Sequence, residues 1–167
     1  GNEWFNASFA EFHKHADALE ALRAQAQHII DVSKRTQDLS NVEYVFSTWT
    51  YSADQWHTRQ IMQTTDVAKH VDAIAIAPYF NDQVQLMERL HHVRAHRRLA
   101  NKFGLPLYAY EFGQDVQRDG AGDFNRSQEL GDLYYEALSI MSPLFERIML
   151  YNAASIFKND RHGMAWG

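Results

Sequence analysis

Four short apolar runs alternate with longer segments in which apolar residues recur every three or four positions. The runs are rich in β-branched, aromatic or alanine residues, which is typical of buried parallel strands. They predict strands at 42–50, 73–80, 107–111 and 148–154. Repeated strand–helix units of this kind predict a parallel sheet with right-handed crossovers.

The segments between these runs have the spacing of amphipathic helices. One apolar stripe runs from Phe9 to Ile29, and another from Leu130 to Leu144. A third helix is expected from about 82 to 103, because Gly104 follows as a stop signal and Pro106 opens the next strand. A helix around 58–70 completes the alternation.

Two α/β architectures fit this order: a (β/α)8 TIM barrel and a doubly wound sheet. The strand at 73–80 carries small alanines on one face and Ile74, Ile76 and Pro78 on the other. A small-residue face suits a crowded barrel interior, and a bulky face suits packing under helices. No glycine-rich phosphate loop follows a strand, which weakens the dinucleotide-binding alternative.

The number of units predicts only part of a barrel. A complete barrel takes eight units and about 250 residues. This chain has four strands and, at residues 1–3, the end of a fifth. We therefore interpret residues 1–167 as a single partial domain, the C-terminal half of a barrel from the end of strand four to strand eight. The remainder is expected in the parent chain or in another chain.

Composition narrows the class of function. Of 167 residues, 46% are hydrophobic and 13% aromatic, which is a globular composition. The net charge of −5 argues against a general nucleic-acid binder. The absence of cysteine excludes a disulfide scaffold, a thiolate metal site and a cysteine nucleophile. No apolar run approaches the roughly 20 residues that span a bilayer, so no membrane segment is expected.

Two carboxylates lie where barrel chemistry is expected. Glu111 ends an apolar run just before a loop, and Glu3 lies between Asn2 and Trp4. Barrel enzymes place their chemistry at the C-terminal ends of strands. Two carboxylates on either side of a glycosidic bond are the minimum needed to cleave it.

Strand alternation makes a further prediction about the strand at 107–111. If Glu111 faces the barrel interior, Leu107 and Ala109 do so as well. Tyr108 and Tyr110 would then face the helices. This division places the small and acidic residues inside and the large aromatic residues outside.

Three weaker signals point to metals or phosphate, and we discount them. His92 and His96 are four residues apart on a helix, but a third zinc ligand is lacking, so we interpret them as part of a solvated face. The basic stretch around them is interpreted in the same way. Asp115, Asp119 and Asp123 recur in the loop at 113–125 without the spacing of a calcium-binding EF-hand. We therefore expect no metal and no cofactor.

Two strings of residues resemble a known group of enzymes. Gly1-Asn2-Glu3-Trp4-Phe5-Asn6 and Tyr110-Glu111-Phe112-Gly113-Gln114 resemble the strand-four and strand-seven motifs of clan A glycoside hydrolases. They are also similar to strings in bacterial barrel proteins, Asn-Glu-x-Trp-Asn and Tyr-Glu-Gly-Gly-Gln. The resemblance covers essentially the whole chain.

The resemblance implies roles for individual residues. Glu3 would be the acid/base, Glu111 the nucleophile, and Asn2 a ligand of the sugar 2-hydroxyl. Tyr79, at the end of the strand before, would hydrogen-bond the nucleophile. Two departures stand out. Trp4 comes one place early relative to the bacterial string, and Phe112 replaces its glycine, which would narrow the sugar subsite. A secreted or extracellular location is also implied.

Four further residues complete the expected substrate-binding set. Flat indole rings stack on sugars, so Trp4, Trp49 and Trp166 are candidates, and Gln114 follows the second motif. The sequence thus predicts a retaining glycoside hydrolase acting on a β-linked glycan. The alternatives are a catalytically inactive barrel that binds carbohydrate or another protein, and a doubly wound α/β binding protein.

Overall fold

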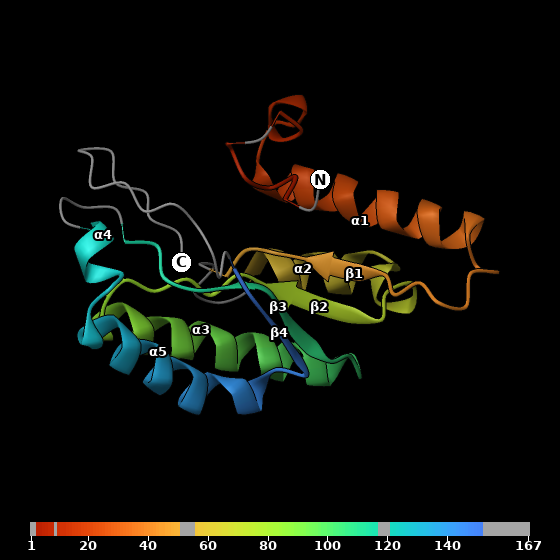
Figure 1. The fold of residues 1–167 in the computed structure, drawn as a ribbon. Coiled ribbons are helices and arrows are strands. Elements are labelled where there is room, and N and C mark those ends of the chain that lie inside the picture. The colour runs from red at the N-terminus through yellow and green to blue at the C-terminus, as the bar shows by residue number, and fades with distance from the viewer. Residues whose placement is uncertain (1–2, 9, 51–55, 117–120, 152–167) are drawn as a thin grey trace.

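The computed structural model describes residues 3–8, 10–50, 56–116 and 121–151. Within these ranges one parallel sheet forms the centre of the molecule (Figure 1). Its strands follow chain order: β1 (Val45–Ser47), β2 (Ala73–Ile76), β3 (Leu107–Phe112) and β4 (Arg147–Leu150). Each neighbouring pair is parallel, as the sequence predicts.

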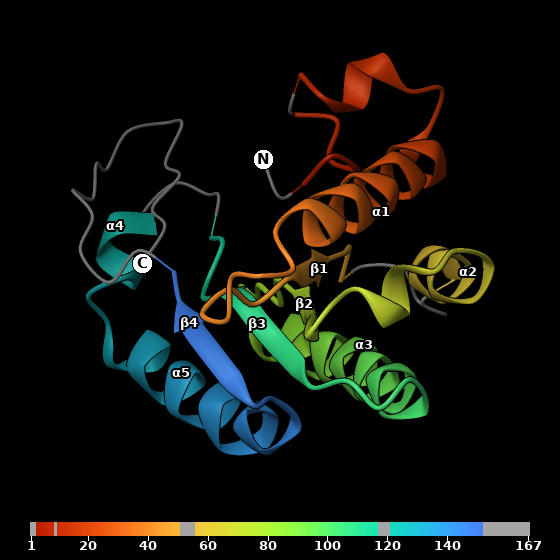
Figure 2. The same ribbon diagram turned by 90° about the vertical axis from the view of Figure 1, so that its right-hand side faces the viewer.

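Helices follow one another around this sheet in chain order (Figure 2). The longer ones are α1 (Ala18–Arg35), α2 (Trp56–Thr64), α3 (Gln83–Lys102) and α5 (Gln128–Met141). Short helical turns occupy η1 (Phe12–Lys14), η2 (Val67–Lys69), α4 (Ala121–Phe124) and η3 (Ser142–Leu144). None of the helices in the described ranges is long and apolar enough to cross a membrane.

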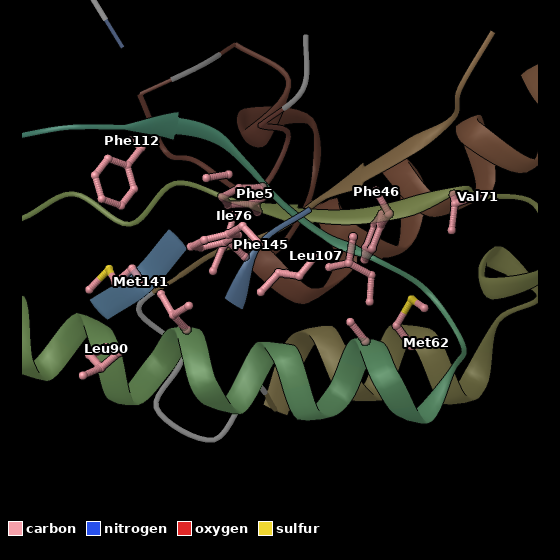
Figure 3. Close-up of a cluster of buried hydrophobic side chains, with 14 of the residues drawn as sticks. Phe5, Phe46, Met62, Val71, Ile76, Leu90, Leu107, Phe112, Met141 and Phe145 are labelled. Carbon is pink, nitrogen blue, oxygen red and sulfur yellow. The ribbon is translucent and has the colours of Figure 1, made fainter. Parts of the chain in front are cut away.

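The two faces of the sheet carry different side chains. Ile74, Ile76 and Leu107 belong to the large core between sheet and helices (Figure 3). Ala73, Ala75 and Tyr108 form a small separate cluster on the opposite face. The predicted division of faces is therefore confirmed over Ala73–Ile76, the four residues to which β2 shortens the strand predicted at 73–80.

Consecutive strand order with helices on one face favours a barrel segment over a doubly wound sheet. In a doubly wound sheet the strand order reverses and helices cover both faces. Here the sheet order follows the chain, and the cluster on the second face includes no helical residue. The fold is therefore a mixed α/β arrangement of the kind found in part of a TIM barrel.

An ion pair shows how strongly the sheet curves. Arg147, the first residue of β4, donates from both terminal nitrogens to Glu43, at 2.5 and 2.9 Å. Glu43 lies just before β1, on the far side of the sheet, and in a flat sheet these outer strands would be roughly 14 Å apart. The Arg147 guanidinium also lies 5.0 Å from the Tyr108 ring. The pair therefore spans the side of the sheet away from the helices.

Capping residues set the helix boundaries. The carboxylate of Asp17 accepts from the backbone N–H of Glu20 at 2.9 Å, so α1 begins at Ala18 and not at Phe9, where the apolar stripe begins. Asp82 caps α3 in the same way, and Gly104 ends it with a φ of 69°. The helix predicted at 82–103 is therefore confirmed.

Other boundaries differ from the prediction. The strand predicted at 42–50 is reduced to the three residues of β1, and the helix predicted at 58–70 divides into α2 and η2. The loop predicted at 113–125 contains α4. The strand predicted at 148–154 begins one residue early, and residues 152–154 lie outside the described ranges.

The interpretation of His92 and His96 as solvated is wrong. Both are buried, and His96 is completely so. His96 Nδ1 lies 3.0 Å from the carbonyl of His92, and burial lowers the pKa of His96 to about 4. Both histidines are therefore buried residues of the core and not part of a solvated face.

Among the described residues β4 pairs only with β3, so its other edge is open, and it carries exposed apolar side chains: Met149 is 54% exposed and Leu150 53%. Because such an edge is a template for pairing with another chain, we expect Met149→Lys to reduce self-association of the isolated chain. Light scattering after size-exclusion chromatography measures this shift toward monomer. Val84→Lys, at an 80% exposed position on α3, is the control. Equal effects of the two substitutions would contradict the prediction.

Candidate active site

A cavity of about 550 Å³ lies at the carboxyl ends of the strands. Thr48 and Trp49 reach it from the end of β1, Tyr79 from beyond β2, and Tyr151 from beyond β4. Phe5, Asn6, Phe12 and Ala18 come from the segment around η1 and the start of α1. The lining includes six aromatic side chains and three carboxylates: Glu3, Glu111 and Asp115.

Glu111 is fixed by a tyrosine from the neighbouring strand. The hydroxyl of Tyr79 donates to Oε2 of Glu111 at 2.6 Å. Arg89 donates from Nε to the Tyr79 carbonyl at 3.0 Å, and the Tyr151 ring meets the Tyr79 ring edge-on at 5.9 Å. These contacts to its backbone and its ring fix the position of Tyr79 beside the carboxylate of Glu111.

An irregularity in β3 turns Glu111 toward the cavity. Between Ala109 and Phe112 the strand advances three residues while β4 advances only two, from Ile148 to Leu150. One extra residue in β3 is a bulge, which breaks the alternation of faces. Tyr110 and Glu111, although adjacent, consequently both line the cavity.

The facing predicted for β3 is therefore wrong. Leu107 and Ala109 pack in the helix-side core, whereas Tyr108 belongs to the cluster on the opposite face, with Tyr110 packed against it. Strict alternation would then direct Glu111 toward the helices. The bulge instead directs Glu111 to the cavity. The pattern of apolar and polar residues did not predict this bulge.

Glu3 reaches the same cavity from outside the sheet. Its Oε1 accepts from the hydroxyl of Tyr110 at 2.5 Å, and its Oε2 accepts from Nδ2 of Asn6 at 2.8 Å. The segment is anchored to α1, because the backbone N–H of Trp4 donates to Gln25 Oε1 at 3.2 Å. The buried Gln25 in turn donates to the carbonyl and hydroxyl of Ser47, both at 3.0 Å.

The two glutamates are electrostatically coupled. The pKa of Glu111 is raised, first by burial and also by the negative charge of Glu3, while the hydrogen bond from Tyr79 opposes the rise. The phenol of Tyr79 has a raised pKa because of burial and its bond to Glu111, so it stays a donor. Repulsion between two carboxylates in one cavity raises the affinity of the pair for a proton.

Asp115 is a third carboxyl that sequence reasoning considered only for calcium. Its backbone N–H donates to the Phe80 carbonyl at 3.1 Å, which ties the loop after β3 to the loop after β2. Burial raises the pKa of Asp115, and the nearby Arg89 opposes this. Its Oδ1 is buried without a hydrogen-bond partner. Tyr110, another lining residue, was likewise given no role from sequence.

The remaining predicted site residues divide into three groups. Trp49, 39% exposed, lines the cavity and stacks on Phe5 at 6.4 Å. Trp4 instead packs on His28, with ring centroids 5.3 Å apart. Gln114 is fully buried, and its Oε1 accepts a hydrogen bond from the backbone N–H of Val116 at 2.6 Å. Asn2 and Trp166 lie outside the described residues.

Comparison with known proteins finds a likeness of fold among solved structures. No family model and no curated protein matches the chain. Among solved structures, it is similar to GH26C from Muricauda sp. MAR_2010_75, with a TM-score of 0.53 and 19% sequence identity. The match covers 80% of this chain and 36% of that chain. At this identity the likeness establishes a shared fold.

The raised pKa of Glu111 predicts a pH-dependent cost in stability. When folding raises the pKa of a carboxyl group, the protonated group favours the folded state and the ionised group does not. The free energy of unfolding therefore falls as the pH rises through the pKa of the folded state. We expect Glu111→Gln to raise the melting temperature by about 1–3 °C at pH 8, a small gain because the carboxyl is only half buried. The difference should vanish near about pH 4.

Melting curves of the complete natural polypeptide across this pH range test the prediction. Glu129→Gln, at an exposed position in the first turn of α5, is the control and should not become more stable. A melting-temperature difference for Glu111→Gln that is independent of pH would contradict the assignment of Glu111 as a strained carboxylate.

Proposed function

We propose that this chain carries the catalytic residues of a retaining glycoside hydrolase that acts on a β-linked glycan. One observation carries the proposal: Glu3 and Glu111, far apart in the sequence, line one aromatic cavity, and a tyrosine hydroxyl holds each of them. The shared fold with GH26C, a glycoside hydrolase structure, supports it. The lining suits a sugar, because aromatic faces pack on its C–H surfaces.

In the proposed first step Glu3 is the acid and Glu111 the nucleophile. An ionised oxygen of Glu111 bonds to the anomeric carbon while the bond from that carbon to the leaving oxygen breaks. The proton of Glu3 goes to the leaving oxygen, which departs as an alcohol. The products are a glycosyl ester of Glu111 and an ionised Glu3.

The second step reverses the role of Glu3. It removes a proton from water, and the resulting oxygen bonds to the anomeric carbon while the ester bond to Glu111 breaks. Two displacements restore the original configuration, so the β-linked substrate gives a β-sugar. This mechanism requires carboxyl groups about 5–5.5 Å apart, whereas inversion requires a wider gap.

The contacts of each glutamate support this division of roles. The hydroxyl of Tyr79 donates to Glu111 and opposes the rise in the pKa of Glu111 that burial and Glu3 cause, which favours the ionised form that a nucleophile needs. Asn6 and Tyr110 each contact one oxygen of Glu3 and so fix the orientation of this carboxyl group in the cavity. Asn2 remains proposed as the ligand of the sugar 2-hydroxyl, and Trp49 as a stacking surface.

We also propose that further barrel strands cover the unpaired edges of this sheet. The apolar side chains of Met149 and Leu150 on the edge strand β4 support the proposal, as does the small second face of the sheet. These strands would come from the parent chain or from another chain. A secreted or extracellular location stays a prediction.

A carbohydrate-binding module without activity is the second candidate, favoured by the exposed ring of Trp49 at the cavity. Binding to β-glycans measured by calorimetry separates the two. A binding module would lose affinity in Trp49→Ala and keep it in Glu111→Gln, and it would show no turnover.

We expect the complete natural polypeptide to hydrolyse a member of a panel of 4-nitrophenyl β-glycosides and β-linked polysaccharides. Glu3→Ala should slow hydrolysis about 10²- to 10⁴-fold, the usual contribution of acid–base catalysis. Azide should restore the turnover of Glu3→Ala and release a β-glycosyl azide. With Glu111→Ala, azide should instead release an α-glycosyl azide. No turnover of any member, or full activity in Glu111→Gln, would refute the proposal.

Tyr79→Phe is expected to lower kcat/KM about 10- to 100-fold, the usual worth of a hydrogen bond to a charged group. Its hydrogen bond opposes the rise in the pKa of Glu111, so its loss should move the acidic limb of the pH–rate profile to higher pH. Tyr135→Phe, on the exposed face of α5, is the control. An unchanged acidic limb in Tyr79→Phe would contradict the role of Tyr79.

A further inference from the structure

Tyr110 connects the two glutamates through both its side chain and its backbone. Its hydroxyl donates to Oε1 of Glu3, and its peptide unit continues directly into Glu111. The bulge in β3 directs both side chains to the same cavity. A movement of Tyr110 would therefore change the position of one carboxylate relative to the other.

Glu3 has few other ties to the sheet. Its second oxygen is held by Asn6, which is three residues along the same segment and moves with it. The backbone of this segment is tied to α1 through Trp4 and Gln25. Within residues 3–8, 10–50, 56–116 and 121–151, Tyr110 is the one sheet residue that hydrogen-bonds the carboxylate of Glu3.

We infer that Tyr110 is a positioning residue that sets the separation and orientation of Glu3 relative to Glu111. The inference rests on the proposed glycosidase function and deepens it. Tyr110 donates its hydrogen bond to the charged form of Glu3, which is the form that the second step requires. The same bond holds the carboxylate while the leaving group departs and water enters.

Removal of this hydroxyl has a specific consequence. Glu3 loses its hydrogen bond to the sheet, so its carboxyl group is no longer held in a fixed position relative to Glu111. The looser carboxylate should lower kcat about 10- to 100-fold while KM changes by less than about 3-fold.

The experiment compares Tyr110→Phe with wild type in the complete natural polypeptide, on the 4-nitrophenyl β-glycoside that the panel identifies. Tyr108→Phe is the matched control, because it removes a hydroxyl from the same strand and the same face of the sheet. The aromatic ring at position 108 is retained, so its contact with the Arg147 guanidinium is retained as well. We expect kcat to fall, with little change in KM, in Tyr110→Phe only. Melting temperatures report whether each variant folds.

A double variant tests whether Tyr110 acts through Glu3. Glu3→Gln combined with Tyr110→Phe should be no slower than Glu3→Gln alone, because residues that act as a unit are not additive. Additive losses, or a kcat of Tyr110→Phe equal to that of wild type, would overturn the inference. Absence of turnover in wild type would instead remove the proposed function, so the two failures are distinguishable.

Discussion

A β-strand alternates its side chains between two faces, and this constraint conflicts with what the cavity needs from β3. Leu107 and Ala109 must face the helices to fill the core, and regular alternation would then bury Glu111 with them. One extra residue between Ala109 and Phe112 resolves the conflict, because Phe112 regains the core while Tyr110 and Glu111 share the opposite face. The position of each candidate catalytic group depends on this local break in the ladder.

The cavity is held together by tyrosines that cross from one structural element to another. Tyr79, beyond β2, holds the glutamate of β3, and Tyr110, in β3, holds the glutamate of the N-terminal segment. Each phenol presents a proton to a carboxylate in partly dry surroundings, where such bonds are stronger than in water. The mutual repulsion of the acids is thereby balanced by neutral donors, and no cation lies among the described lining residues.

The sequence predicted those features that repeat along an element. Helix α3, the parallel order of strands and the two faces of β2 follow from apolar spacing and the stop signal at Gly104. The pairing of Glu111 with Tyr79 was anticipated from a family resemblance. The bulge was not, because it is a register relation between two strands that neither strand encodes alone. Trp4 was expected near a sugar, but its ring packs on His28 of α1 and on His15, which precedes that helix.

The bulge also gives β3 an unusual sensitivity to chain length. Loss of one residue between Ala109 and Phe112 would restore a regular ladder with β4, but only one of Tyr110 and Glu111 would then remain on the cavity face. A substitution in this stretch alters one side chain and keeps both positions, whereas a deletion removes one of the two positions from the cavity. The geometry of this strand therefore tolerates a change of residue identity better than a change of residue number.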